Sequence, residues 1–117
     1  MLKKTLLGLS LCSLLAAGQA LAHAHLQSST PADSAQLKEA PKSLSLNFSE
    51  AARLARLKVT LDGKEIPIAL DKAAKPSQAF TFPLPALAPG SYTVEWAAVA
   101  ADDGHVTKGM FKFSISG

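Results

Sequence analysis

The sequence predicts an all-β protein, a seven-stranded antiparallel β-sandwich of Greek-key type. Two observations predict it. Short runs in which apolar and polar residues alternate recur along the chain, and this is the pattern of half-buried strands. Clusters of Pro, Gly, Asp and Ser separate these runs, as turns do in antiparallel β-proteins.

The strands are expected in close succession, with short connections. Asp62-Gly63 and Pro89-Gly90 predict turns, and Pro67 predicts an edge strand because proline cannot donate a hydrogen bond to a neighbouring strand. A connection is expected at residues 37–41, and residues 50–56 are the only stretch that could form a helical turn. The expected strands are residues 24–28, 43–49, 57–61, 66–68, 80–82, 92–96 and 111–116.

Residues 1–22 have the features of a secretory signal peptide. Lys3 and Lys4 form a basic start, Thr5–Leu15 is mostly apolar but too short to span a bilayer, and Ala20-Leu21-Ala22 matches a signal-peptidase cleavage site. Cleavage after Ala22 leaves one domain of about 95 residues, 23–117, with no further membrane span.

Composition excludes several classes of function for residues 23–117. The full chain has 12 Lys+Arg against 9 Asp+Glu, and loss of Lys3 and Lys4 brings these charges close to balance. No basic patch with interleaved aromatic residues appears, which argues against a nucleic-acid partner. The single cysteine, Cys12, leaves with the signal, so the domain has neither a disulfide nor a thiolate ligand.

The three histidines lie beside two notable signals. After cleavage, His23 would carry a free α-amine next to its own imidazole, a chelating pair on one residue. Asp103 and His105 are two residues apart, so in an extended segment they would point to the same face, with Gly104 leaving the space between them open. Together these residues offer three nitrogens and one oxygen to a metal ion.

This donor set favours Cu(II), which prefers tetragonal nitrogen and oxygen ligands and leads the divalent affinity order. Zinc is an alternative, although it prefers a tetrahedral site and seldom uses a terminal amine. Each signal also has a simpler explanation: Asp103 and His105 as a solvated turn, and His23 as an accident of the cleavage site. The metal hypothesis depends on their occurring together.

His25 has two interpretations. A free amine with histidine at the third position is itself a copper-binding sequence, which uses the amine, two deprotonated amides and the His25 imidazole. That mode requires a flexible terminus. If the first strand is ordered, His25 is instead expected to orient the site through a hydrogen bond or to serve as an alternative ligand. Trp96 is expected in the core, with a position at the wall of the metal site as the alternative.

Five motifs, in order, resemble those of the CopC family of periplasmic copper-binding proteins, and they cover nearly all of residues 23–117. The form of the last one is most similar to the YobA-type branch. The motifs are His23-Ala24-His25-Leu26, Ser29-Thr30-Pro31-Ala32, Leu46-Asn47-Phe48-Ser49-Glu50, Pro89-Gly90-Ser91-Tyr92-Thr93-Val94-Glu95-Trp96 and Asp103-Gly104-His105-Val106-Thr107-Lys108-Gly109.

The resemblance implies a cupredoxin-like or Ig-like sandwich and one Cu(II) bound by the His23 amine and imidazole, Asp103 and His105. It also suggests a CopD-type inner-membrane protein as a partner, by analogy. Some family members add a methionine-rich loop for Cu(I). This chain has only Met1 and Met110, so no Cu(I) site is expected.

The predicted function is therefore periplasmic Cu(II) binding for copper homeostasis or resistance, as a carrier or sequestering protein and not an enzyme. One alternative is a copper-dependent oxidative enzyme similar to lytic polysaccharide monooxygenases, which also use an N-terminal histidine. About 95 residues leave little room for the substrate surface of such an enzyme. The other alternative is a metal-free Ig-like interaction module.

Overall fold

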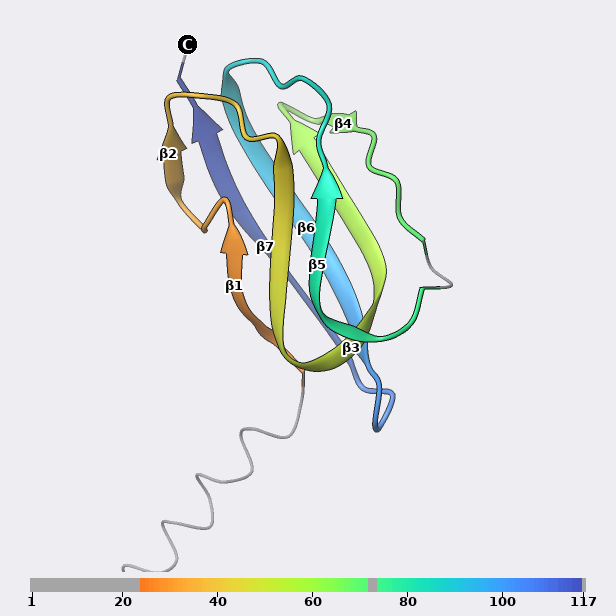
Figure 1. The fold of residues 1–117 in the computed structure, drawn as a ribbon. Helices are drawn as coiled ribbons and strands as arrows, with labels where there is room; N and C mark the ends of the chain where they lie inside the picture. Colours follow the sequence, from red (N-terminus) through yellow and green to blue (C-terminus); the bar gives the residue numbers. More distant parts are fainter. Residues whose placement is uncertain (1–23, 72–73, 117) are drawn as a thin grey trace, which may run out of the picture.

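The computed structural model describes residues 24–71 and 74–116, so the predicted signal peptide and His23 lie outside the described residues. The described part is all-β, as expected, and contains no helix that could span a membrane (Figure 1). Its seven strands are β1 (Leu26–Thr30), β2 (Ala35–Leu37), β3 (Ser43–Leu61), β4 (Lys64–Ile66), β5 (Ser77–Pro83), β6 (Gly90–Ala100) and β7 (Val106–Ile115).

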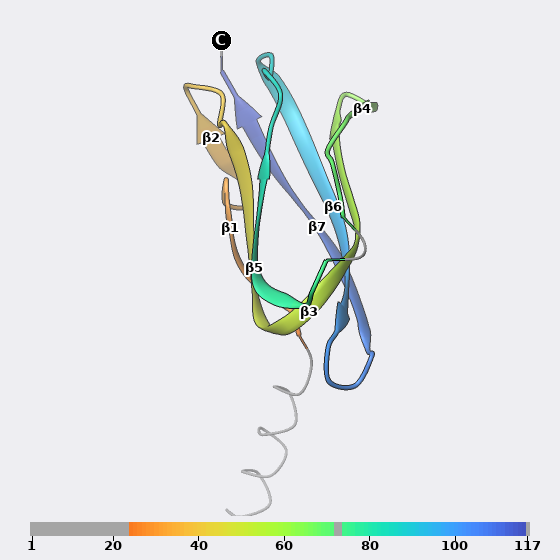
Figure 2. The same cartoon turned by 45° about the vertical axis from the view of Figure 1, so that its right-hand side comes forward.

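All seven strands belong to one curled sheet, and β3 connects its two halves. The main path of the sheet runs β1-β3-β6-β7-β2, while β4 and β5 also pair with β3. The first half of β3 pairs with β1 and β5, and the second half pairs with β6 and β4. Figure 2 shows β3 bending between these halves, which face one another. The expected sandwich-like arrangement thus comes from two facing halves of one curled sheet, and not from the two separate sheets of a Greek-key sandwich.

The sheet is also mixed, which corrects the prediction of a purely antiparallel fold. β2 pairs in parallel with the end of β7, through Ala35 and Phe113, Gln36 and Ser114, and Leu37 and Ile115. β2 is not among the strands expected from the sequence, and Leu37 was expected in a connection. A strand of three residues is too short to show the alternating pattern on which the prediction relied.

Strand β3 differs most from expectation because it merges two predicted strands into one of 19 residues. The helical turn considered for residues 50–56 is wrong. Ala52 and Leu54 are buried there and alternate with exposed neighbours, but alanine on both faces hides this alternation in the sequence. β1 also begins two residues later than predicted.

The core lies between the two halves of the curled sheet. Leu44, Leu46 and Phe48 enter it from the first half of β3, and all are at most 1% exposed. Phe48 meets Trp96 of β6 edge to face, with ring centroids 5.3 Å apart. Trp96 is thus a core residue, as expected. The buried Tyr92 stacks on Phe113 at 5.1 Å, which joins β6 to β7 inside the core.

Three segments distant in sequence meet at one end of the sheet, the lower end in Figure 1: the start of β1, the bend of β3 and the β6–β7 connection. Hydrogen bonds join them. The Ser49 amide donates to the His25 carbonyl at 2.8 Å, and the Ala101 amide donates to the Ala51 carbonyl at 3.0 Å. Of the predicted site residues, the described ones, His25, Asp103 and His105, lie at this end.

Candidate metal centre

The segment that precedes β1 is fixed against the beginning of β7. Ala24 is 1% exposed and belongs to the hydrophobic core. Its carbonyl accepts a hydrogen bond of 2.8 Å from the Thr107 hydroxyl. Thr107 is only two residues beyond His105, so residue 24 is held close in the fold to one of the predicted ligands.

His25 is tied to the bend of β3 through Ser49. The His25 amide donates to the Ser49 hydroxyl at 3.0 Å, and its ring Nδ1 lies 3.2 Å from the same oxygen. With the Ser49 amide donating to the His25 carbonyl, the two residues are joined by three polar contacts. The amide nitrogen of His25 is therefore engaged within the fold. The copper-binding mode that deprotonates this amide would have to give up that bond.

The β6–β7 connection brings Asp103 and His105 together, as predicted, but by a different geometry. Gly104 has φ of +73°, in the left-handed region that glycine adopts readily, and residues 101–103 form a turn instead of an extended segment. The Gly104 amide donates to the Ala100 carbonyl at 3.0 Å, and the Ala100 amide donates to the His105 carbonyl at 2.8 Å. The backbone thus closes the loop on itself.

The Asp103 carboxylate contacts His105 with both oxygens. Its Oδ1 accepts from the His105 amide at 3.0 Å, and its Oδ2 lies 3.2 Å from the ring Nδ1. The side chains remain solvent-accessible, His105 at 59% and Asp103 at 40%. A carboxylate and an imidazole therefore lie side by side at the surface, where a metal ion from solution has access to them.

The described residues hold two of the three predicted ligands, and the third lies outside them. Among residues 24–71 and 74–116, no group of three or more His, Cys, Asp or Glu side chains is placed to hold a metal ion. His23 is joined by one peptide bond to Ala24, the residue that Thr107 fixes. The described residues therefore supply only part of the predicted ligand set.

Sequence reasoning missed two residues that build this end of the molecule, Ser49 and Thr107. Both are short hydroxyl residues within the motifs quoted above, and their partners are backbone or ring atoms far along the chain. Thr107 lies two residues after His105, so the sequence places it near a predicted ligand but does not identify the partner of its hydroxyl. Nothing in the sequence marks it as the partner of residue 24.

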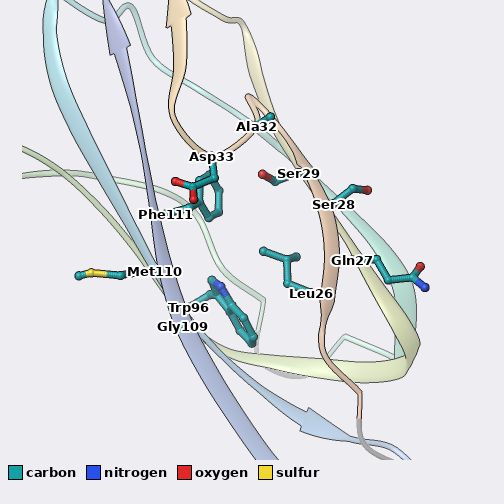
Figure 3. Close-up of a pocket in the computed structure, with 10 residues that line it drawn as sticks. All are labelled: Leu26, Gln27, Ser28, Ser29, Ala32, Asp33, Trp96, Gly109, Met110 and Phe111. Atoms are coloured by element: carbon teal, nitrogen blue, oxygen red, sulfur yellow. The ribbon is translucent and has the colours of Figure 1, made fainter. Parts of the chain in front are cut away.

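A groove lies between β1 and β7, and neither Asp103 nor His105 is among the residues that line it (Figure 3). Leu26, Trp96 and Phe111 contribute apolar side chains to it, with Ser28 and Ser29 on the β1 side. Trp96 therefore lines this groove and contacts Phe48, and the alternative that it forms a wall beside Asp103 receives no support. Met110, also at this groove, is the only methionine among the described residues.

A comparison with models of known protein families identifies the family of this chain. Residues 26–116 match the model of the CopC domain. This chain belongs to the CopC domain family.

Individual relatives agree with this assignment. Protein YobA of Escherichia coli K12 is 37% identical over 101 residues, covering 80% of this chain and 79% of YobA. Copper resistance protein C of Escherichia coli is 35% identical over 108 residues, covering 82% of this chain and 83% of that protein. The family resemblance seen in the sequence motifs is thus confirmed.

Solved structures of CopC proteins share the fold. The crystal structure of CopC from Methylosinus trichosporium OB3b has a TM-score of 0.65 at 26% identity, covering 80% of this chain and 94% of that one. PcoC, a methionine-rich copper resistance protein from Escherichia coli, also has a TM-score of 0.65, at 28% identity, covering 81% and 100%. This chain has two methionines and is therefore not methionine-rich.

Proposed function

We propose that this CopC-family protein binds one Cu(II) in the periplasm, as a carrier or sequestering protein in copper homeostasis or resistance and not as an enzyme. The observation that carries the proposal is the hydrogen bond from Thr107 to the Ala24 carbonyl. It holds the residue after His23 beside the strand that begins just beyond His105. The naming of one relative as a copper resistance protein supports the choice of copper.

In the proposed site, signal cleavage exposes the His23 amine and imidazole, and Asp103 and His105 complete the coordination. Three nitrogens and one oxygen suit Cu(II) better than zinc. The contact between Asp103 Oδ2 and His105 Nδ1 supports this arrangement because two donor groups already lie 3.2 Å apart. His25 is proposed to lie outside the coordination sphere and to position the N-terminal segment through Ser49.

Handover of copper requires a partner, and we propose an inner-membrane protein of the CopD type. This choice rests on analogy with the family alone. The proposal includes no Cu(I) site. A single thioether, that of Met110, falls short of the several soft ligands that Cu(I) prefers.

The test compares two forms of the protein in a Cu(II) titration with a competing chelator. One form begins at His23, and the other retains a single extra alanine before it. We expect the extension to weaken binding by at least about a hundredfold, because the amine is moved away from the imidazole with which it chelates.

The control variant carries Lys38→Ala, an exposed change in the connection between β2 and β3. It should bind copper with unchanged affinity. Equal affinities of the His23-terminated and extended forms would remove His23 from the site.

A further inference from the structure

The outer face of the sheet formed by β3, β6 and β7 carries a regular array of residues. In antiparallel strands, directly paired residues lie on the same face. The inner face is identified by buried residues such as Val94 and Trp96, so the residues between them face outward. The array has four rows: Arg53, Val99 and Val106; Arg56, Ala97 and Lys108; Lys58, Glu95 and Met110; and Thr60, Thr93 and Lys112.

A β-bulge places both arginines on this outer face. Arg53 and Arg56 are three residues apart, so in a regular strand they would point to opposite faces. The register between β3 and β6 shifts between Leu54 and Arg56, which leaves Ala55 as the extra residue. After this bulge, Arg56 returns to the same side as Arg53. The irregularity therefore adds a positive charge to the face.

The resulting surface, which we call the basic face, carries five cations and one acid. The cations are Arg53, Arg56, Lys58, Lys108 and Lys112, and the acid among them is Glu95. A second acid, Glu65 of β4, is paired with Thr60 and lies at the edge of this face. Among the described residues, none of these five cations forms a salt bridge. Half of the positive charges outside the predicted signal are thus gathered on a single face, although the domain as a whole is nearly balanced.

Apolar groups lie among these charges. Val106 is 60% exposed and Met110 is 57% exposed, and they are the exposed large hydrophobic residues of the described part. A hollow of about 430 Å³ lies on this face, and the residues that line it include Arg56, Glu95, Lys108 and Met110, together with Trp96 and Gly109. Exposed apolar side chains ringed by charges are typical of protein interaction sites.

We propose that the basic face is a docking surface for a protein partner with an acidic, carboxylate-rich face. Strand spacings place the array on about 20 Å by 10 Å of backbone, which is a small area even with its side chains added. That area is at the low end for specific interfaces and fits a transient complex. Complementary charges speed the encounter of such partners, while Met110 and the hollow supply contacts that are not ionic.

A protein suits this surface better than an anionic membrane does. The cations occupy fixed positions on a paired sheet, and fixed carboxylates on a partner gain from that geometry, whereas mobile lipid headgroups do not. Surfaces that insert into membranes also present Trp, Phe or Leu beside the cations. The basic face exposes only Val106 and Met110. The proposal does not require bound copper, so it stands or falls separately from the metal site.

The experiment uses the metal-free protein that begins at His23, with a short poly-glutamate peptide as the probe, followed by NMR at two salt concentrations. Saturable shifts are expected on the basic face, including the Met110 methyl group, and they should weaken as salt rises. R56E/K108E should lose at least about tenfold in affinity. E95Q should bind more tightly, because it removes the acid that lies among the cations.

The matched control is K38E/K42E, which makes the same charge change at exposed lysines outside the basic face. It should retain affinity within about threefold. An equal loss in both double variants, or shifts spread over the whole surface, would overturn the proposal. A membrane-binding result would also overturn it. In that case the wild-type protein would co-sediment with phosphatidylglycerol vesicles at physiological salt, and the R56E/K108E variant would not.

Discussion

At the scale of single residues, the hydroxyl of the buried Tyr92 shows how the fold accommodates a polar group in its core. Tyr92 is the largest fully buried side chain of residues 24–71 and 74–116, and its hydroxyl donates to the Ala88 carbonyl. Burial raises the pKa of Tyr92 above its usual value of 10.0, the Ala88 hydrogen bond opposes this rise, and the charge of Asp62 adds to it. The folded protein therefore keeps this phenol neutral at a pH where the unfolded chain ionises.

This shift predicts how stability depends on pH in alkaline solution. Because the folded pKa is raised, the contribution of Tyr92 is fully present below about pH 10 and is lost as the pH rises further and the unfolded chain ionises. Tyr92 is the only tyrosine, so tyrosinate absorbance reports it alone. We expect its titration to occur above pH 10 in the folded protein and to fall to the ordinary range in denaturant.

Tyr92→Phe is the matched variant. It should cost about 1 kcal/mol at neutral pH through loss of the bond to Ala88, and its stability should fall less steeply above pH 10 than that of the wild type. A folded-state titration at the ordinary value would contradict the burial of the hydroxyl.

At the scale of elements, the hydrogen bond between the pre-β1 segment and β7 organises the candidate site. Thr107→Val keeps the shape of the side chain but removes the hydroxyl that donates to the Ala24 carbonyl. We expect Cu(II) affinity to fall about three- to tenfold, because the terminus must then be ordered at the cost of binding energy. Competitive Cu(II) titration measures this, and no proposed ligand has been changed.

Thr93→Val is the control, since Thr93 lies on the outer face of β6 and touches no part of the site. It should bind copper like the wild type. A Thr107→Val protein with unchanged affinity, intact by its denaturation curve, would show that this anchor does not matter for binding.

The packing of β6 on β7 gives a second test at this scale. Gly109 is the register partner of Trp96, and a Cβ at Gly109 would lie 3.0 Å from the indole ring. Gly109→Ala should therefore force the indole to shift and destabilise the protein by about 1–3 kcal/mol. Urea denaturation followed by Trp96 fluorescence measures the change.

Val106→Ala, at an exposed position of the same strand, should stay within about 0.5 kcal/mol of the wild type. If Gly109→Ala were equally neutral, the close packing of the indole on β7 would be wrong.

A comparison of the observed strands with the predicted ones shows which features the sequence predicts. Alternation located most strands because their buried residues are large, as in Leu44, Leu46 and Phe48. It failed at residues 50–56, where alanine occupies both faces, and at β2, whose partner is the distant end of β7. For the site, it correctly paired Asp103 with His105 but predicted an extended segment. The turn depends on the positive φ of Gly104. Because glycine adopts several backbone conformations readily, the sequence does not single out this one.

At the scale of the whole molecule, the curled sheet separates two surfaces with different chemistry. One end gathers residues 24 and 25, Ser49 and the Asp103–His105 loop, while the outer face of β3, β6 and β7 carries cations. The first follows from long-range hydrogen bonds and the second from strand register, and a linear sequence displays neither. The match of residues 26–116 to the CopC domain confirms the family that the sequence motifs predict. The ligand set at the end of the sheet remains the central proposal.

Pulsed EPR of the protein that begins at His23, loaded with one equivalent of Cu(II), tests this proposal most directly, because it counts coordinated imidazoles. We predict two imidazoles in the wild type, two in His25→Ala and one in His105→Ala. The opposite pattern, with an imidazole lost on His25→Ala and none lost on His105→Ala, would place the copper on the N-terminal segment alone. It would contradict a site completed by the β6–β7 connection.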